Sequence, residues 1–340
     1  MTSRMQREVQ EIPEAAERLL SRGASAVATA ARALAETDPP YLASIARGSS
    51  DHVATYLKYC SEILLGLPVA SLGPSVASVY HAPLRLAGSG CIAVSQSGRS
   101  PDIVEMVRAA RQGHALTIAL TNAPDSPLAT ASVHVLDILA GPEASVAATK
   151  TFVNSAIAGL WLLALWRDDG ELLAALRALP EALSRAIACD WAELRATLAG
   201  HRSLYTLGRG PAFAISNEAA LKFKETCQVH AESYSSAELM HGPVSIVGEG
   251  FPVLALAAAD AAEPLLVDVA ERLAEQGAAV FVTSARARKA ERLEHVRTGH
   301  PLTDPIALIA AFYANVEQLA RALGLDPDRP RHLRKVTETL

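Results

Sequence analysis

The two halves of this 340-residue chain repeat one order of apolar runs and turns. The matching stretches are 41–50 with 203–210, 92–94 with 253–255, and 116–121 with 279–283, all at nearly the same offset. Self-similarity at a fixed spacing is typical of a duplicated structural unit. Because 340 residues also exceed the size at which single hydrophobic cores usually stop growing, the sequence predicts two domains built on one plan.

Alanine- and leucine-rich segments separate the apolar runs, and their spacing fits amphipathic helices, as at 103–112 and 264–276. Short apolar strands that alternate with helices indicate parallel sheets. We therefore expect an α/β fold of two tandem, doubly wound parallel sheets flanked by helices. A charged, helical segment at 168–200 marks the expected junction. The expected divisions are 1–170 for an N-terminal helix and the first domain, 171–327 for linker helices and the second domain, and 328–340 for a C-terminal tail.

Charge and composition narrow the classes of partner. A net charge of −5 and a pI near 6.1 provide no basic field for a nucleic-acid backbone. The charged N-terminal segment 1–20 reads as an amphipathic helix rather than a signal peptide, and the apolar segment 152–166 is too short for a membrane span. The four cysteines are far apart and form no CxxC pair, which argues against a zinc knuckle or a disulfide framework. We expect a cytoplasmic protein with no nucleic-acid or membrane partner.

Small polar side chains follow two of the predicted strands. Gly48, Ser49 and Ser50 follow the first, and a run from Ser95 to Ser100 follows the second. Hydroxyl and amide groups at a helix start, with a glycine that allows close approach, suit a sugar phosphate. Helix capping uses the same residue types. Since two such clusters are expected to face one crevice, we favour a phosphate-binding role for both.

A third small polar segment, 141–150, precedes the long apolar helix. A ligand could touch this loop. Considered alone, it is better explained as an ordinary connection with Thr149 as the helix cap.

An ionisable helix and a polar segment stand out in the second half. Glu218, Lys222 and Glu225 share one helix face, as they would in a solvated salt-bridge ladder. The segment 230–243 has little apolar periodicity and carries two histidines and two glutamates, as expected of a loop that presents groups to a cleft. An enzyme that isomerises a sugar phosphate needs one group to open the ring and another to move a proton between C1 and C2, and His241 and Glu225 fit these roles. These residues show no HxxxH or comparable metal-ligand spacing, so we expect no metal site. Isomerisation by proton transfer needs no redox cofactor, so we expect no cofactor either.

Together these motifs resemble the sugar isomerase (SIS) domain family. The resemblance is strongest to the isomerase half of glutamine:fructose-6-phosphate amidotransferase, and the stand-alone glucosamine-6-phosphate deaminases of the family offer the best match in organisation. The family motifs correspond here to Gly48-Ser49-Ser50, Ser95-Gln96-Ser97-Gly98-Arg99-Ser100, Val146-Ala147-Ala148-Thr149-Lys150, Ala220-Leu221-Lys222-Phe223-Lys224-Glu225, His230-Ala231-Glu232-Ser233-Tyr234, Glu238-Leu239-Met240-His241-Gly242-Pro243 and the tail 328–335. Six motifs in the right order, closed by the tail, make a specific signature.

The resemblance implies a role for each site residue. It implies that Glu225 is the C1–C2 base, that Lys222 lies near the developing enediol charge, and that His241 opens the ring. In the family this histidine comes from the neighbouring subunit, so a homodimer is implied. It implies that Lys335 forms a Schiff base with the ketose. The implied sugar-phosphate contacts are Gly48, Ser49, Ser50, Ser95, Gln96, Ser97, Ser100, Val146, Ala147, Glu218 and Arg334.

Departures from the family pattern guide the choice of reaction. Ala148 replaces a serine, and Arg99-Ser100 replaces Glu-Thr. No glutaminase segment precedes the first predicted strand, so we expect deamination of glucosamine 6-phosphate to fructose 6-phosphate and ammonia. A galactosamine-6-phosphate deaminase or isomerase, a fructosyl-amine phosphate deglycase and a non-catalytic phosphosugar sensor remain alternatives. Retention of Glu225, His241 and Lys335 counts against the sensor.

Overall fold

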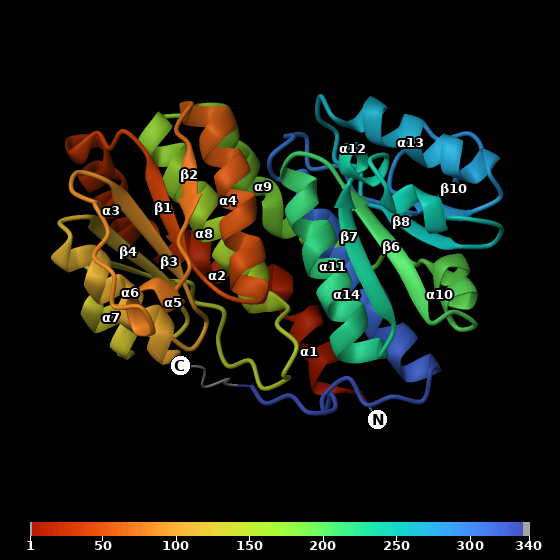
Figure 1. The fold of residues 1–340 in the computed structure, drawn as a ribbon, viewed down its shortest axis with the longest axis horizontal. Helices are drawn as coiled ribbons and strands as arrows, with labels where there is room; N and C mark the ends of the chain where they lie inside the picture. The colour runs from red at the N-terminus through yellow and green to blue at the C-terminus, as the bar shows by residue number, and fades with distance from the viewer. Residues whose placement is uncertain (1, 336–340) are drawn as a thin grey trace. The chain divides into compact units, whose positions relative to one another are not determined.

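A computed structural model describes residues 2–335, whose strands form two five-stranded sheets (Figure 1). The first sheet has the order β2-β1-β3-β4-β5, and the second has the order β10-β9-β8-β6-β7. Every pair of neighbouring strands is parallel. The strands are β1 (Leu42–Ile45), β2 (Val69–Ser71), β3 (Gly90–Val94), β4 (Leu116–Thr121), β5 (His134–Asp137), β6 (Ser203–Gly208), β7 (His230–Ser235), β8 (Pro252–Ala255), β9 (Ala279–Val282) and β10 (Glu291–Arg292).

Helices flank both sheets, so the predicted α/β fold class is confirmed. The helices are α1 (Arg4–Gln10), α2 (Ile12–Arg22), α3 (Ala24–Thr37), α4 (Ser49–Leu65), α5 (Ser75–Ser78), α6 (Pro101–Gln112), α7 (Pro127–Ala131), α8 (Lys150–Arg167), α9 (Gly170–Ala186), α10 (Ala192–Leu198), α11 (Pro211–Cys227), α12 (Ser236–Leu239), α13 (Glu263–Glu275) and α14 (Asp304–Ala322), with one 3-10 turn, η1 (Pro243–Ile246). The single amphipathic helix expected over 1–20 is instead two helices, α1 and α2, separated at Glu11.

The predicted repeat is also a repeat of backbone geometry. In each half the chain leaves the first strand through a glycine, Gly48 (φ 55°, ψ −133°) or Gly210 (φ 60°, ψ −138°). Positive φ at these turns favours glycine because a side chain would crowd the backbone. Each glycine opens a helix of 17 residues, α4 or α11. In both sheets the strand order reverses beside this turn, which is where doubly wound sheets bind ligands.

The described chain divides into two compact units, and each sheet lies in one of them. The unit with the first sheet comprises 14–143, 150–177 and 334–335, and the unit with the second comprises 2–13, 144–149 and 178–333. Helix α1 and the short segment 144–149 therefore belong to the unit of the second sheet. The domain limits expected at 170 and 327 stay predictions.

Long apolar helices supply much of the core of each unit. Helix α8 is buried from Lys150 to Ala164 and packs on α3 and α4, so the apolar segment 152–166 lies largely in a buried helix. In the other unit, α14 is buried over most of its length and packs on α11. No helix within residues 2–335 is long and apolar enough to cross a membrane.

Candidate functional site

The two small polar clusters of the first half lie at one edge of the first sheet. Strands β1 and β3 are parallel neighbours, with Ile45 opposite Ala93, so the segments that follow them emerge side by side. Ser49 and Ser50 open α4 and are partly exposed, and Ser95 is buried while Gln96 and Ser97 are partly exposed. The structure thus brings together the two clusters that the sequence singled out.

The loop after β3 is shaped by hydrogen bonds and by Gly98. The Ser95 hydroxyl accepts from the Gly98 amide at 3.2 Å, and the Ser97 hydroxyl accepts from the Arg99 amide at 3.4 Å. Gly98 has φ +60°, and a Cβ there would lie 2.1 Å from Ser126 Oγ. Ser100 holds the N-cap position of α6, yet its hydroxyl makes no capping bond. Helix capping therefore does not account for Ser100.

Arg99 stands where the family motif has an acidic residue. It is exposed, and it lines an open pocket of about 480 Å³ together with His81 and Arg108. The substitution therefore adds a positive charge to the outer side of the loop.

A carboxylate on α1 holds the segment that carries Val146 and Ala147. Glu8 is 5% exposed and accepts hydrogen bonds from the Ala144 amide and from the amide and hydroxyl of Ser145. The Ser145 hydroxyl also donates to the Ala147 carbonyl at 3.0 Å. Val146 remains partly exposed, whereas Ala147 is buried. Sequence reasoning missed Glu8, because it looks like one more charge on an amphipathic helix.

The ionisable residues of α11 form a buried group rather than a solvated ladder. Lys222 Nζ lies 2.6 Å from Glu225 Oε2 and 3.1 Å from Glu218 Oε1, and the side chains of Lys222 and Glu218 are fully buried. The Tyr313 hydroxyl donates to Glu218 Oε1 at 3.0 Å. The Glu225 side chain is 19% exposed. One carboxylate of the group thus reaches solvent while the ammonium that holds it does not.

The neighbouring carboxylates fix the protonation state of Lys222. Burial alone would lower its pKa, but the negative charges of Glu218 and Glu225 outweigh burial and raise the pKa above the usual lysine value. Lys222 therefore remains an ammonium at neutral pH. Removing it would leave a buried carboxylate without this cation.

The segment 230–243 is only partly the loop that the sequence predicted. Residues 230–235 form β7, an edge strand parallel to β6, so the loop expectation is wrong for this stretch. Edge strands tolerate polar, exposed side chains such as Glu232, and this weakens the apolar signal of a strand. His241 lies in the exposed turn that follows α12.

The tail carries Arg334 and Lys335 to the unit of the first sheet. Lys335 Nζ lies 2.8 Å from Glu143 Oε2, and Arg334 is exposed. Upstream, Asp328 accepts hydrogen bonds from the Arg4 and Met5 amides at 2.7 and 2.9 Å, at the start of α1. The tail motif therefore combines a structural aspartate with a lysine held by a carboxylate.

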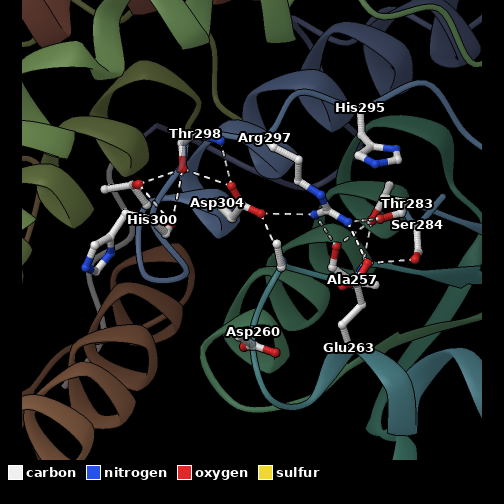
Figure 2. Close-up of polar contacts among 12 residues, drawn as sticks. Ala257, Asp260, Glu263, Thr283, Ser284, His295, Arg297, Thr298, His300 and Asp304 are labelled. Carbon is white, nitrogen blue, oxygen red and sulfur yellow. Dashed lines mark hydrogen bonds and ion pairs between the residues drawn. The ribbon is translucent and has the colours of Figure 1, made fainter. Parts of the chain in front are cut away.

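The corresponding edge of the second sheet is filled by an arginine (Figure 2). Arg297 donates to the Ala257 carbonyl at 2.9 Å and the Thr283 carbonyl at 3.0 Å, after β8 and β9. The same guanidinium pairs with Glu263 at 2.9 Å and Asp304 at 3.0 Å, the first residues of α13 and α14. The chain thus has hydroxyl side chains at the edge of the first sheet and an internal ion-pair network at the edge of the second.

Comparisons with known proteins agree with this arrangement. The SIS domain profile matches residues 40–165 and 197–323. The glutamine–fructose-6-phosphate aminotransferase (isomerizing) of Symbiobacterium thermophilum is 33% identical over 314 residues, covering 86% of this chain and 51% of that protein. The enzyme of the same name from Pyrobaculum aerophilum is 34% identical, covering 96% of this chain and 56% of its own length. The chain spans about half the length of the curated relatives it matches.

Solved structures extend the comparison. The crystal structure of a candidate phosphosugar isomerase from Silicibacter pomeroyi DSS-3 has 62% identity and a TM-score of 0.93, covering 96% of this chain and 100% of that one. Glucosamine-6-phosphate deaminase from Thermotoga maritima has 19% identity and a TM-score of 0.77 over 99% of this chain and 100% of its own, a likeness of fold. With both halves matched by the profile and the fold repeated in these structures, the chain belongs to the SIS domain family.

Proposed function

We propose that this protein is a phosphosugar enzyme that converts glucosamine 6-phosphate to fructose 6-phosphate and ammonia. The observation that carries the proposal is the buried Glu218–Lys222–Glu225 group, in which one carboxylate is partly exposed and a fixed ammonium holds it. Curated relatives carry names that refer to fructose 6-phosphate, and a deaminase of glucosamine 6-phosphate shares the fold. These names supply the substrate class.

Glu225 is the proposed base. Its carboxylate accepts the proton from C2 of the open-chain amino sugar and delivers it to C1, so that the C1 aldehyde becomes a hydroxymethyl group and the C2 amine becomes an imine. The product imine at C2 then hydrolyses to the ketone and releases ammonia. Lys222 fixes the orientation of the carboxylate at 2.6 Å and supplies positive charge as the enediol-type oxygen develops negative charge.

His241 is the proposed ring-opening residue, which moves a proton between the ring oxygen and the C1 hydroxyl. Its place in an exposed turn fits donation to a neighbouring copy of the chain, so a homodimer is part of the proposal. Ser49, Ser50, Ser95, Gln96 and Ser97 are the proposed contacts for the sugar phosphate. Their support is the shared sheet edge and the partly exposed side chains.

The remaining expected contacts stay proposals as well. Val146 and Ala147 would contact the sugar through their backbone, since neither side chain has a polar group. Gly48 would allow close approach of the ligand, Ser100 would add a hydroxyl, and Arg334 would add charge from the tail.

The test measures ammonia and fructose 6-phosphate after glucosamine 6-phosphate is added to the purified protein, with galactosamine 6-phosphate in parallel. Equal amounts of the two products from the first sugar support the proposal. Release from galactosamine 6-phosphate alone would reassign the substrate. If neither sugar releases ammonia although both bind measurably, the deaminase proposal is wrong, and a deglycase or a phosphosugar sensor becomes the better assignment.

Two variants separate chemistry from binding. Glu225→Gln should lower turnover by about 100-fold or more and leave sugar-phosphate affinity within a few-fold, because the amide keeps the shape but cannot take the proton. Glu275→Gln, which changes an exposed glutamate paired with Lys289, is the matched control and should leave turnover unchanged. Full turnover by Glu225→Gln would overturn the catalytic assignment.

A further inference from the structure

We propose that Glu143 is the proton-transfer partner of Lys335, taking the ammonium proton when this lysine attacks a ketose carbonyl and returning it to the departing water. The inference rests on the proposed function, namely that a ketose phosphate is bound, and on the Schiff-base role that the family resemblance implies for Lys335. The observation behind it is the 2.8 Å contact between Lys335 Nζ and Glu143 Oε2.

Glu143 is a carboxylate held in one orientation. Its side chain is fully buried, and Thr151 anchors it through the amide, 3.2 Å from Oε1, and through the hydroxyl, 2.7 Å from Oε2. Thr151 is the second residue of α8, so the carboxylate lies at the N-terminus of a helix of 18 residues. Free amides and the helix dipole stabilise a negative charge there. Glu143 is thus held by Thr151 and Lys335 in an environment that favours a negative charge.

Lys335 meets this carboxylate with a side chain that is only partly buried. The lysine side chain is 24% exposed, in contrast to the buried carboxylate. The pair is not an exposed surface pair, because its carboxylate is buried and would lack this cation without the lysine. A nucleophilic lysine has a different requirement, because its ammonium must lose a proton before nitrogen can attack. Glu143 Oε2 is within hydrogen-bond distance of that proton.

The proposed step balances in atoms and charge. Glu143 takes one proton from the Lys335 ammonium, and the free amine adds to the C2 carbonyl carbon of the open-chain ketose. A proton moves from nitrogen to the former carbonyl oxygen, giving a neutral carbinolamine. Glu143 then returns its proton to that hydroxyl, the C–O bond breaks, and water leaves as nitrogen forms the C=N bond. The protonated imine carries the single positive charge that the ammonium had.

This role differs from that of a latch that only docks the tail. A latch needs charge complementarity, which would make Lys335→Arg equivalent to the native residue. A proton-transfer partner needs a carboxylate that changes its protonation state, so Glu143→Gln removes the function while keeping an oxygen that accepts from Thr151. Glu143→Asp keeps the acid on a shorter side chain and should rescue part of the function.

The experiment is borohydride trapping of the imine with fructose 6-phosphate, with the adduct on Lys335 measured by mass spectrometry between pH 6 and 10. We expect the native protein to form the adduct near neutral pH. Glu143→Gln should form it on the order of 100-fold more slowly there and recover as the pH rises, because solvent must then remove the proton. Glu143→Asp should fall between them, and Glu62→Gln, in an exposed ion pair with Lys58, should match the native protein.

Each outcome decides the proposal. Equal trapping rates for the native protein and Glu143→Gln at every pH would overturn it, and so would a native protein that forms no adduct on Lys335. If Glu143→Gln does not fold, the pH profile of Glu143→Asp decides, since an unchanged profile overturns the role. The two proposals can fail separately. If trapping depends on Glu143 but glucosamine 6-phosphate releases no ammonia, the role of Glu143 stands and the deaminase reaction is rejected. Limited proteolysis at Arg331 and Arg334 reports tail docking separately.

Discussion

Lys222 Nζ and Glu225 Oε2 lie 2.6 Å apart on consecutive turns of α11, with the ammonium fully buried and the carboxylate 19% exposed. The asymmetry suits the proposed role of Glu225 as a base, because a base must reach its substrate, whereas the group that orients it works best in a low dielectric. Glu218 supplies a second negative charge that offsets the desolvation cost of the buried ammonium. The Tyr313 hydroxyl in turn donates a hydrogen bond to Glu218.

Replacing Lys222 by methionine should destabilise the protein by about 3–5 kcal/mol, because Glu218 would remain buried without its cation. Urea unfolding measures this loss. Lys58→Met, which removes an exposed pair with Glu62, should cost no more than about 1 kcal/mol. Similar losses in the two variants would contradict the view that the α11 charges are a buried unit.

Arg297→Met should cost about 3 kcal/mol or more, since it leaves Glu263 and Asp304 close together without their shared cation (Figure 2). Arg286 offers a matched comparison because it also pairs with Glu263 but is 64% exposed. Arg286→Met should change the unfolding free energy by less than about 1 kcal/mol. A ranking with Arg286→Met as the costlier change would refute the assignment of Arg297 as the central group.

Stability should fall as the pH drops below about 6.5, in part through His295. Burial, and secondarily the nearby Arg297 charge, lower the pKa of His295 in the folded protein, although its bond to the Leu293 carbonyl acts the other way. Because the unfolded histidine titrates near 6.5, the unfolded chain binds more protons between the two pKa values, and stability rises with pH across that window. Unfolding curves at pH 7.5 and 5 should differ less for His295→Gln than for the native protein. An equal pH dependence would exclude His295 as a contributor.

Gly98→Ala should weaken both folding and sugar-phosphate binding. The added Cβ would lie 2.1 Å from Ser126 Oγ at a φ of +60°, so the loop must shift. Gly88→Ala is the control, because Gly88 also has a positive φ of +77° but has no atom within 4 Å of the added carbon. We expect about 1 kcal/mol of destabilisation at Gly88 and clearly more at Gly98. Calorimetric titration with fructose 6-phosphate should show weaker affinity for Gly98→Ala alone.

The sequence predicts the parts of this molecule that depend on local pattern. The two parallel sheets could be predicted from apolar runs, helical spacing and the repeated glycine turns. Strands buried on both faces appear as short apolar runs, and the helices between them show the 3.6-residue period of an amphipathic helix. The strand β7 escaped prediction because an edge strand with polar side chains lacks that period.

Long-range polar contacts could not be predicted in the same way. Glu8 meets Ser145, 137 residues away, and Arg297 gathers carboxylates from the starts of two helices. Nothing in the neighbouring sequence of these residues distinguishes them from solvated charges. The low exposure of Glu8, 5%, results from the tertiary structure and cannot be predicted from residue spacing in the sequence.

The shared turn geometry of Gly48 and Gly210 allows the two 17-residue helices to be compared position by position. Counted from each glycine, Glu218 is the eighth residue and Lys222 the twelfth, and the same positions of α4 are Tyr56 and Cys60. Tyr56 and Cys60 are 1% and 0% exposed, so these positions are interior in both helices. The same backbone geometry thus carries uncharged buried side chains in one copy and a buried ion cluster in the other. The charges at positions eight and twelve of α11 are therefore not required by the fold, since the same helix positions are filled in α4 by side chains without a formal charge.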